Sequence, residues 1–240
     1  MLPHVLRRYL GALRRTPLHP QWLLAGAGPE LVLLRELPPC RLLDIGCADR
    51  WVEHALAPGV QYLGLDYPPT GEALYHARPC VFADAARLPF ASSSVDVVTL
   101  FEVVEHLRFP REALSEAGRV LRPGGCLLLT IPFLYPIHDA PHDYQRYTAH
   151  GLRRDLEACG FLVERLEPRL GSAETAGLLA CLALGGMAIE ALRRRSPAVV
   201  FVPAIAVAVP LLNIGAWLAG RFLPAWPAVT AGYFVRATKR

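Results

Sequence analysis

The chain has 240 residues, 53% of them hydrophobic, and a formal net charge of +4. This length suits one domain with an insertion and is sufficient for a well-formed core. The six cysteines include no CxxC pair and no zinc-like cluster. We therefore exclude a disulfide framework and expect reduced thiols in a cytosolic setting. The start of the chain has no long apolar run, so no secretory signal is predicted.

The N-terminal stretch is basic and amphipathic. Within residues 2–13 the leucines, Val5 and Tyr9 share one face of a predicted helix, and the arginines lie off that face. Two interpretations stay open: the helix rests on anionic lipid, or it covers the active-site face of its own domain with the arginines in solvent. Prolines and glycines between residues 17 and 29 separate it from a helix predicted over residues 30–37.

One strand and the turn after it organise the rest of the chain. Residues 41–45 are a short apolar run that ends at Gly46, and a second run, residues 60–65, ends at Asp66, twenty residues after that glycine. In a doubly wound α/β sheet the first strand-to-helix turn binds a nucleotide-like ligand, and an acid at this offset accepts hydrogen bonds from both ribose hydroxyls. The alternative is an ordinary βαβ turn with a surface aspartate.

Further strands alternate with helices. We predict helices over residues 51–57, 110–121 and 148–159, and strands over residues 80–84, 95–101, 126–131, 161–166 and 231–238. Such alternation predicts an α/β fold in which a mainly parallel sheet is covered on both faces.

Five sequence pieces carry a resemblance to a known family. LLDIGCAD, YLGLD, FADAARLPF, SVDVVTLFEVVEHL and RVLRPGGCLLLTIP follow one another between about residues 41 and 132. Together they resemble class I S-adenosylmethionine-dependent methyltransferases of the broad type 11 group. The resemblance implies a doubly wound, Rossmann-like sheet of seven strands with an antiparallel last strand, and S-adenosylmethionine as the cofactor.

The resemblance also implies which residues bind the cofactor. The first loop would lie under the methionine part, the second acid would hold the ribose, the third would meet the adenine edge, and the end of the fourth strand would line the methionine side. The residues at these positions are Asp44, Gly46, Cys47, Ala48, Asp66, Asp84, Ala85, Phe101, Glu102 and His106.

The first loop departs from the usual GxGxG pattern of the family. Ala48 and Arg50 stand where the second and third glycines are expected. We expect the methyl group of Ala48 to be tolerated while its φ stays negative, and the long Arg50 side chain to need room beside the loop.

The segment after the fifth predicted strand is the candidate acceptor site. Residues 136–148 resemble a P-x-H-x-x-P-x-D-Y-x-R-Y-T stretch of a bacterial subset of these enzymes that is often linked to cell-surface glycan or lipid pathways. We predict His138 or His142 as the general base and Arg146 as the partner of an anionic acceptor. The alternative is that Asp143, Arg146 and Tyr147 hold the loop against the next helix. No metal site is predicted, because His138, His142 and Asp143 lack a further ligand cluster.

An apolar insertion, residues 171–227, separates the last two strands. Residues 198–219 carry no charge and are long enough to span a bilayer, whereas the uncharged residues 175–189 are marginal. Two crossings would place Arg193, Arg194 and Arg195 outside, against the positive-inside tendency. We therefore favour a hairpin that dips into one leaflet, with a lid over the acceptor cleft or a dimer face as the alternative.

The sequence thus predicts a bacterial methyltransferase on the inner face of the cell membrane, acting on an amphipathic or lipid-linked acceptor. The rivals are a soluble small-molecule methyltransferase with an apolar lid and a non-catalytic scaffold. Nucleic-acid methylation is not expected, because no aromatic and basic platform is present. The predicted regions are residues 1–29, a core over 30–170, the insertion over 171–227, and the last core strand over 228–240.

Overall fold

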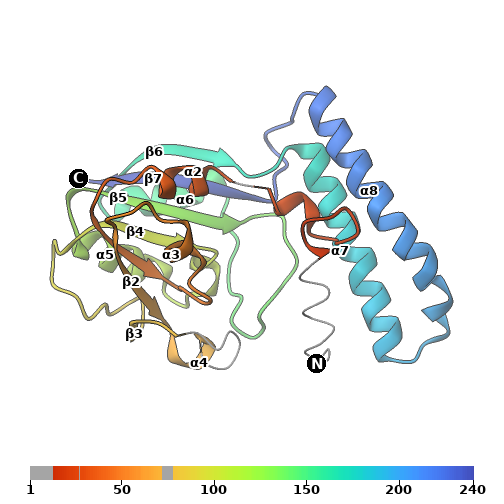
Figure 1. The fold of residues 1–240 in the computed structure, drawn as a ribbon, viewed down its shortest axis with the longest axis horizontal. Helices are drawn as coiled ribbons and strands as arrows, with labels where there is room; N and C mark the ends of the chain where they lie inside the picture. The colour runs from red at the N-terminus through yellow and green to blue at the C-terminus, as the bar shows by residue number, and fades with distance from the viewer. Residues whose placement is uncertain (1–12, 27, 72–77) are drawn as a thin grey trace. The chain divides into compact units, whose positions relative to one another are not determined.

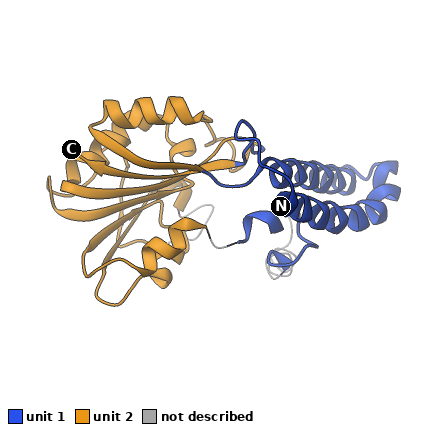
Figure 2. Ribbon diagram, turned by 90° about the horizontal axis from the view of Figure 1, so that it is seen from above, with its two compact units in different colours: residues 1–26, 134–136, 168–231 blue, residues 27–133, 137–167, 232–240 orange. Residues whose placement is uncertain are grey.

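The computed structural model describes residues 13–26, 28–71 and 78–240. The predicted N-terminal helix therefore lies, but for its last residue, outside the described residues. The chain divides into two compact units (Figure 2). The sheet unit comprises residues 27–133, 137–167 and 232–240, and the helical unit comprises residues 1–26, 134–136 and 168–231. Each unit is described by itself.

The sheet unit contains a seven-stranded mixed sheet in the order β3-β2-β1-β4-β5-β7-β6 (Figure 1). Strands β1 to β4 and β5 pair in parallel, and β7 runs antiparallel to β5. The predicted fold, a doubly wound Rossmann-like sheet with an antiparallel last strand, is confirmed. The strands are β1 (Arg41–Ile45), β2 (Gln61–Asp66), β3 (Val81–Phe82), β4 (Val95–Phe101), β5 (Leu121–Pro132), β6 (Phe161–Pro168) and β7 (Gly232–Lys239).

Helices cover both faces of this sheet because alternate residues of a strand point to opposite sides. Leu43 of β1 belongs to one buried cluster, and its neighbour Leu42 belongs to a second cluster on the other face. Thr148 caps α6 by accepting a hydrogen bond from the Gly151 amide. The helices of the unit are α2 (Pro29–Arg35), α3 (Trp51–Ala55), α4 (Pro68–Thr70), η3 (Val104–His106), α5 (Pro110–Val120) and α6 (Ala149–Ala158).

The bounds of two strands differ from the prediction. β3 is only Val81–Phe82, shorter than the predicted residues 80–84, because it pairs with only the last two residues of β2. β5 begins at Leu121, five residues before the predicted start, because Leu121 already pairs with Val95 and an irregular register follows. Turn residues such as Gly124 thus lie within the strand as an irregularity.

The helical unit is built on a helical hairpin. The predicted apolar insertion is confirmed as helical: α7 (Ser172–Arg193) and α8 (Val202–Phe222) lie side by side (Figure 1), with η4 (Pro197–Phe201) between them and η1 (Trp22–Leu24) also in the unit. A Cβ on Gly177 would lie 2.3 Å from the Ala216 methyl carbon, so glycine permits the close approach of the two helices.

A buried amide ties the N-terminal segment to the middle of the hairpin. The side chain of Asn213, halfway along α8, donates hydrogen bonds to the carbonyl oxygens of Pro17 (2.7 Å) and His19 (3.0 Å). A Cβ on Gly185, well inside α7, would lie 3.2 Å from Pro20. Residues 17–20 therefore lie near the middle of both helices rather than at an end.

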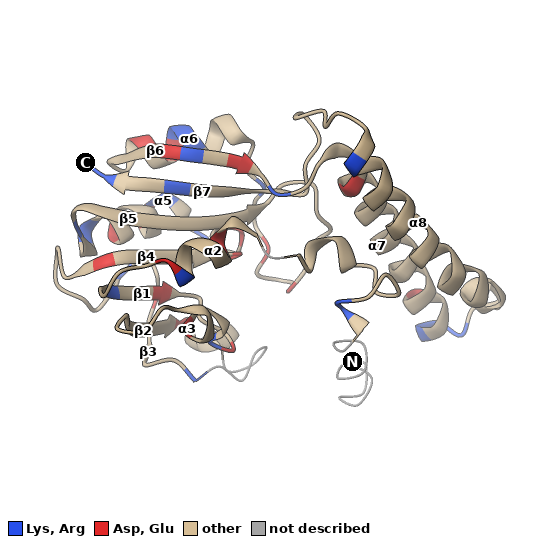
Figure 3. Ribbon diagram, turned by 45° about the horizontal axis from the view of Figure 1, so that its top comes forward, with Lys and Arg blue, Asp and Glu red and all other residues tan. Residues whose placement is uncertain are grey.

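The outer surface of the hairpin is apolar. Both α7 and the stretch Pro197–Phe222 are long and apolar enough to cross a membrane. Only 28% of the apolar 18-residue segment of α7 is buried, and only 11% of the corresponding segment of Pro197–Phe222. Phe201, Leu211 and Phe222 are all more than 60% exposed. Charged residues gather near the two ends of the hairpin (Figure 3).

Candidate cofactor and acceptor site

The turn after β1 has the tight backbone that the sequence predicts. Gly46 has φ +76°, and a Cβ there would lie 2.4 Å from a Val103 methyl carbon, so only glycine fits. The Gly46 and Cys47 amides both donate hydrogen bonds to the Leu65 carbonyl oxygen, at 2.8 and 3.1 Å. The turn is therefore fastened to the end of β2. The Cys47 side chain is buried, and this burial raises the pKa of its thiol to about 12.

The two departures from the glycine pattern keep the glycine-like conformation. Ala48 has φ +42° and Arg50 has φ +62°, so the negative φ that was the condition for tolerating the Ala48 methyl group is not met. Each left-handed residue costs about 1–2 kcal/mol. The Arg50 side chain finds its room away from the turn, in an ion pair of 2.8 Å with Glu53 and over the Tyr62 ring.

Asp44 lies buried beneath this turn and has two hydroxyl donors. The Thr99 and Tyr62 hydroxyls donate hydrogen bonds of 2.6 and 2.8 Å to its two oxygens. Burial raises the pKa of the Asp44 carboxyl to about 7, although these hydrogen bonds act in the opposite direction. Neither Thr99 nor Tyr62 was predicted as a site residue from the sequence. The only cue for Thr99 is that it is a polar residue inside an apolar strand, and the structure pairs it in register with Asp44.

Asp66 joins the tip of β2 to the turn. Its two carboxylate oxygens accept hydrogen bonds from the Ala48 and Tyr67 amides, each at 2.8 Å. Each oxygen of an ionised carboxylate has a second lone pair, so both can still accept a hydroxyl proton. Asp66 thus fits the ribose of S-adenosylmethionine.

The remaining predicted cofactor residues lie along the same sheet edge. Asp84 is exposed and accepts a hydrogen bond from the Ala86 amide, while Ala85 is buried. The Phe101 ring packs 5.4 Å from the ring of Trp51, and Glu102 has φ +55°. These positions are consistent with an aromatic wall and a strained turn at the end of β4, and their roles toward a cofactor stay predictions.

The loop of residues 137–147, here called the acceptor loop, is fastened to η3. The Tyr144 amide donates to the Glu105 carbonyl oxygen at 2.9 Å. The Gln145 side-chain amide donates to the carbonyl oxygens of Val104 and Leu107. The His106 Nδ1 lies 2.7 Å from the His142 carbonyl oxygen. Four hydrogen bonds, each to a main-chain carbonyl oxygen, thus hold this loop beside the end of β4.

Arg146 and Asp143 form a bidentate pair inside the acceptor loop. Both terminal nitrogens of Arg146 donate to the Asp143 carboxylate, which keeps the pKa of that carboxyl at about 2. Tyr147 donates to Asp155 of α6 at 3.2 Å. These contacts are the ones expected if Asp143, Arg146 and Tyr147 hold the loop against the next helix. Pairing of Arg146 with an anionic acceptor stays a prediction.

The two predicted base candidates have different surroundings. His138 lies between two carboxylates, with Nδ1 3.3 Å from Asp143 and Nε2 3.9 Å from Glu105. His142 lies in the same loop with Nδ1 3.3 Å from the Tyr144 hydroxyl. The structure therefore brings both histidines to one loop but places only His138 beside acidic groups.

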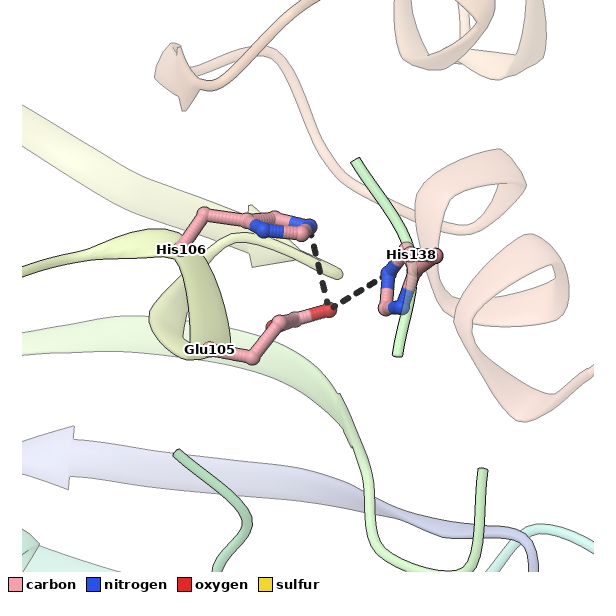
Figure 4. A group of neighbouring side chains, drawn as sticks. All are labelled: Glu105, His106 and His138. Atoms are coloured by element: carbon pink, nitrogen blue, oxygen red, sulfur yellow. Dashed lines mark ion pairs between the residues drawn. The ribbon is translucent and has the colours of Figure 1, made fainter. Parts of the chain in front are cut away.

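Glu105 is a further site residue that was not predicted from the sequence. Its side chain is fully buried, and among the described residues neither carboxylate oxygen has a hydrogen-bond donor. The nitrogens Nε2 of His106 and His138 lie 3.7 and 3.9 Å from its Oε1 (Figure 4). Burial raises the pKa of its carboxyl well above the usual range. No pattern in the sequence indicates this burial, because an acid in VVEHL is typical of a solvent-facing helix residue.

Comparison with known proteins shows what the sheet unit is similar to. Residues 43–129 match the family model described as a methyltransferase domain. This stretch of the sheet unit is therefore similar to methyltransferase domains. Its fold is also that of an S-adenosylmethionine-dependent methyltransferase from Mesorhizobium loti, with a TM-score of 0.52, 18% identity, and coverage of 90% of this chain and 100% of that one.

Two curated relatives extend the comparison. A protein of Mycolicibacterium smegmatis named as a probable S-adenosylmethionine-dependent methyltransferase is 36% identical over 169 residues, 65% of each chain. A malonyl-acyl-carrier-protein O-methyltransferase of Hahella chejuensis is 36% identical over 50% of this chain and 49% of its own. The chain thus spans less than two thirds of the length of these relatives. These similarities imply S-adenosylmethionine as the cofactor, and the Gly46 turn and Asp66 fit that group.

Proposed function

We propose that the protein is an S-adenosylmethionine-dependent methyltransferase that acts on an amphipathic or lipid-linked small molecule or glycan. The observation that carries the methyltransferase part is the Gly46 turn fastened to Asp66 within a methyltransferase domain. The observation that supports the acceptor class is the exposed apolar surface of α7 and α8.

On the cofactor side, the role of this chain's residues is to bind and orient S-adenosylmethionine. Asp66 accepts hydrogen bonds from the ribose hydroxyls, and the turn at Gly46 to Ala48 allows close approach of the methionine part. When bound, S-adenosylmethionine supplies an electrophilic methyl group. Because Ala48 and Arg50 keep the left-handed backbone, the turn retains the shape of a glycine turn. This favours a binding-competent enzyme over a scaffold that has lost the cofactor.

On the acceptor side, His142 is the proposed general base for an oxygen acceptor. Proton removal needs a ring nitrogen that is not already directed at a carboxylate, and His138 has both nitrogens so directed. The aromatic residues of the acceptor loop would stack on a ring or a sugar. His142→Gln should lower turnover on the true acceptor by about 100-fold while cofactor affinity stays unchanged.

For the helical unit, we propose that the hairpin lies along one face of the membrane. α7 and α8, with 22 and 21 residues, are about 30 Å long, enough to cross the hydrocarbon layer. However, the contacts of Asn213 with Pro17 and His19 place the N-terminal segment, with exposed Arg14 and Arg15, near the middle of the hairpin. A spanning hairpin would carry these arginines toward the bilayer midplane, which is costly. An in-plane hairpin leaves them at the headgroups.

Cofactor binding is the first experiment. Calorimetry of S-adenosylhomocysteine with the detergent-purified protein should give micromolar affinity, and Asp66→Ala should lower it by at least about 100-fold, since hydrogen bonds to a charged group contribute about 1.5–3 kcal/mol each. Asp84→Ala, which changes an exposed acid at the same edge, is the matched control and should cost less. A folded wild-type protein that does not bind would contradict the enzyme proposal and favour the scaffold.

The acceptor class is tested by methyl transfer. Labelled S-adenosylmethionine is incubated with the protein and with separate lipid and aqueous fractions of a bacterial extract. Label in the lipid fraction supports the amphipathic acceptor, whereas label only in the aqueous fraction favours a soluble enzyme with an apolar lid.

Membrane association is tested separately. Wild-type protein should stay with carbonate-washed membranes, and replacement of Phe201, Leu211 and Phe222 by Ser should release it. Release of the wild type by carbonate would contradict embedding.

A further inference from the structure

Three metal-ligating side chains converge at the end of β4. Glu105 and His106 belong to η3, and His138 comes from the acceptor loop (Figure 4). One ligand atom from each lies within 4.8 Å of the others. All three residues belong to the sheet unit. The cluster differs from the set weighed in the sequence, because His142 and Asp143 supply only supporting contacts.

Both histidines have their Nδ1 atoms held by hydrogen-bond acceptors. His106 Nδ1 lies 2.7 Å from the His142 carbonyl oxygen, which can only accept, so Nδ1 carries the proton. His138 Nδ1 faces the Asp143 carboxylate at 3.3 Å. In each neutral ring the lone pair is then on Nε2, the atom directed at Glu105. A carbonyl or carboxylate behind a histidine in this way is the usual support for a metal ligand.

The two distances from Glu105 to the histidine nitrogens are longer than hydrogen bonds, and all three ligand atoms lie within 4.8 Å of one another, near enough to share one metal ion. A hydrogen bond would bring the Glu105 oxygen to about 2.7–3.2 Å from a histidine nitrogen. The observed separations are 3.7 and 3.9 Å. Ligand atoms at about 2.0–2.1 Å from a tetrahedral zinc ion lie about 3.3–3.5 Å apart, which small side-chain rotations would reach.

Glu105 supplies the independent reason for a cation. Its side chain is fully buried, and within the part of the chain that the structure describes neither oxygen accepts a hydrogen bond. Burial of a carboxylate without donors is costly. The positive charge of Arg146 acts on Glu105 from nearby, and a metal ion between Glu105, His106 and His138 would supply a direct partner.

We propose that Glu105 Oε1, His106 Nε2 and His138 Nε2 bind one divalent first-row transition-metal ion of the zinc class. Two imidazoles and one carboxylate are ligands that zinc favours, whereas magnesium and calcium favour oxygen ligands alone. Three protein ligands leave a fourth position open for water or an oxygen of a bound molecule. The assignment gives His106 and His138 roles other than those predicted from the sequence, and it stands apart from the methyl-transfer proposal.

Metal binding is measured directly on the whole 240-residue chain in detergent. After chelation, the protein is dialysed against micromolar Zn²⁺ for metal analysis and titrated with Co²⁺ for visible absorption. We expect one ion per chain and the visible bands of four- or five-coordinate cobalt. Glu105→Gln and His138→Gln should weaken binding by more than about 100-fold, beyond the loss of a supporting partner alone.

Two histidine substitutions serve as matched controls. His142→Gln in the same loop and His150→Gln on α6 should bind the metal as the wild type does, since neither side chain is a ligand. Circular dichroism and S-adenosylhomocysteine binding report whether each variant is folded. Wild-type protein without bound metal after dialysis, or unchanged binding by Glu105→Gln and His138→Gln, would overturn the proposal.

A footprint keeps the test decisive if a ligand variant does not fold. Wild-type protein is treated with diethyl pyrocarbonate with and without Zn²⁺, and modified histidines are identified by mass spectrometry. Protection confined to His106 and His138 supports the site. Equal protection of His142 and His150, or none, would overturn it.

Discussion

Two neighbouring regions at one edge of the sheet treat buried carboxylates in opposite ways. In the turn after β1, Asp44 accepts from two hydroxyls and Asp66 accepts from two main-chain amides. Beside the acceptor loop, Glu105 is equally buried but has no such donor among the described residues. The first region has its hydrogen-bond donors in place, whereas in the second the positive charge of Arg146 acts on Glu105 and the proposed metal ion would supply a direct partner.

The presence or absence of hydrogen-bond donors distinguishes a carboxylate that fixes the backbone from one that can bind a metal ion. Donors around Asp44 and Asp66 hold the turn in the shape that a nucleotide-like ligand needs. The two histidines beside Glu105 present lone pairs rather than donors in their neutral form. A buried carboxylate therefore indicates a metal ligand only where hydrogen-bond donors do not already face it.

The largest expected effect is on the turn itself. Gly46→Ala places a methyl group 2.4 Å from Val103 and at φ +76°, so we expect a loss of about 3 kcal/mol in the free energy of unfolding and of cofactor binding. Gly124→Ala is the matched control, because its φ is +74° with open space around it. It should cost only about 1 kcal/mol in urea unfolding. Equal losses in both would show that crowding at Val103 is unimportant.

The second prediction concerns pH and Asp44. Burial raises the pKa of this carboxyl from 3.8 to about 7, with the negative charges of Asp66 and Asp49 adding to the rise and the Thr99 and Tyr62 hydroxyls opposing it. The unfolded state therefore releases its proton first, and the contribution of Asp44 to stability, complete below about pH 4, falls until about pH 7.

Asp44→Asn should remove this pH dependence. The wild-type free energy of unfolding, relative to the variant, should fall by at most about 4 kcal/mol between pH 4 and pH 8. Urea unfolding of both proteins across this range measures it. A constant difference would mean that the two hydroxyl donors keep Asp44 ionised throughout.

The third prediction tests the support behind the proposed metal ligands. Asp143→Asn weakens the hold on His138 Nδ1, and we expect metal affinity to fall by about 10–100-fold. Asp155→Asn, which changes the carboxylate that accepts from Tyr147, should leave metal affinity unchanged. Cobalt titration measures both. An unchanged affinity in Asp143→Asn would separate His138 from the site.

The smallest effect is expected at Ala48. Ala48→Gly relieves a left-handed alanine but gives the unfolded chain more freedom, so the net gain in stability should be about 0.5–1 kcal/mol. Thermal unfolding measures it, and Ala86→Gly is the control without positive φ. A loss of stability in Ala48→Gly would show that the turn has adapted to the methyl group.

The sequence alone determined the fold and the turn around Gly46. Strand periodicity, the spacing from Gly46 to Asp66 and the ordered family motifs are local properties, and they predicted the sheet and its antiparallel last strand. The helical character of residues 171–227 was equally readable from their apolar composition. These features depend on residues close together in the chain.

Only the tertiary structure decided what surrounds each buried group. Thr99 and Tyr62 meet Asp44 through strand pairing, and His138 meets Glu105 across more than thirty residues of sequence. The sign of φ at Ala48 follows from how the turn is fastened to β2, and the place of residues 17–20 follows from the side chain of Asn213. Burial and partners depend on long-range packing, so local sequence does not determine them.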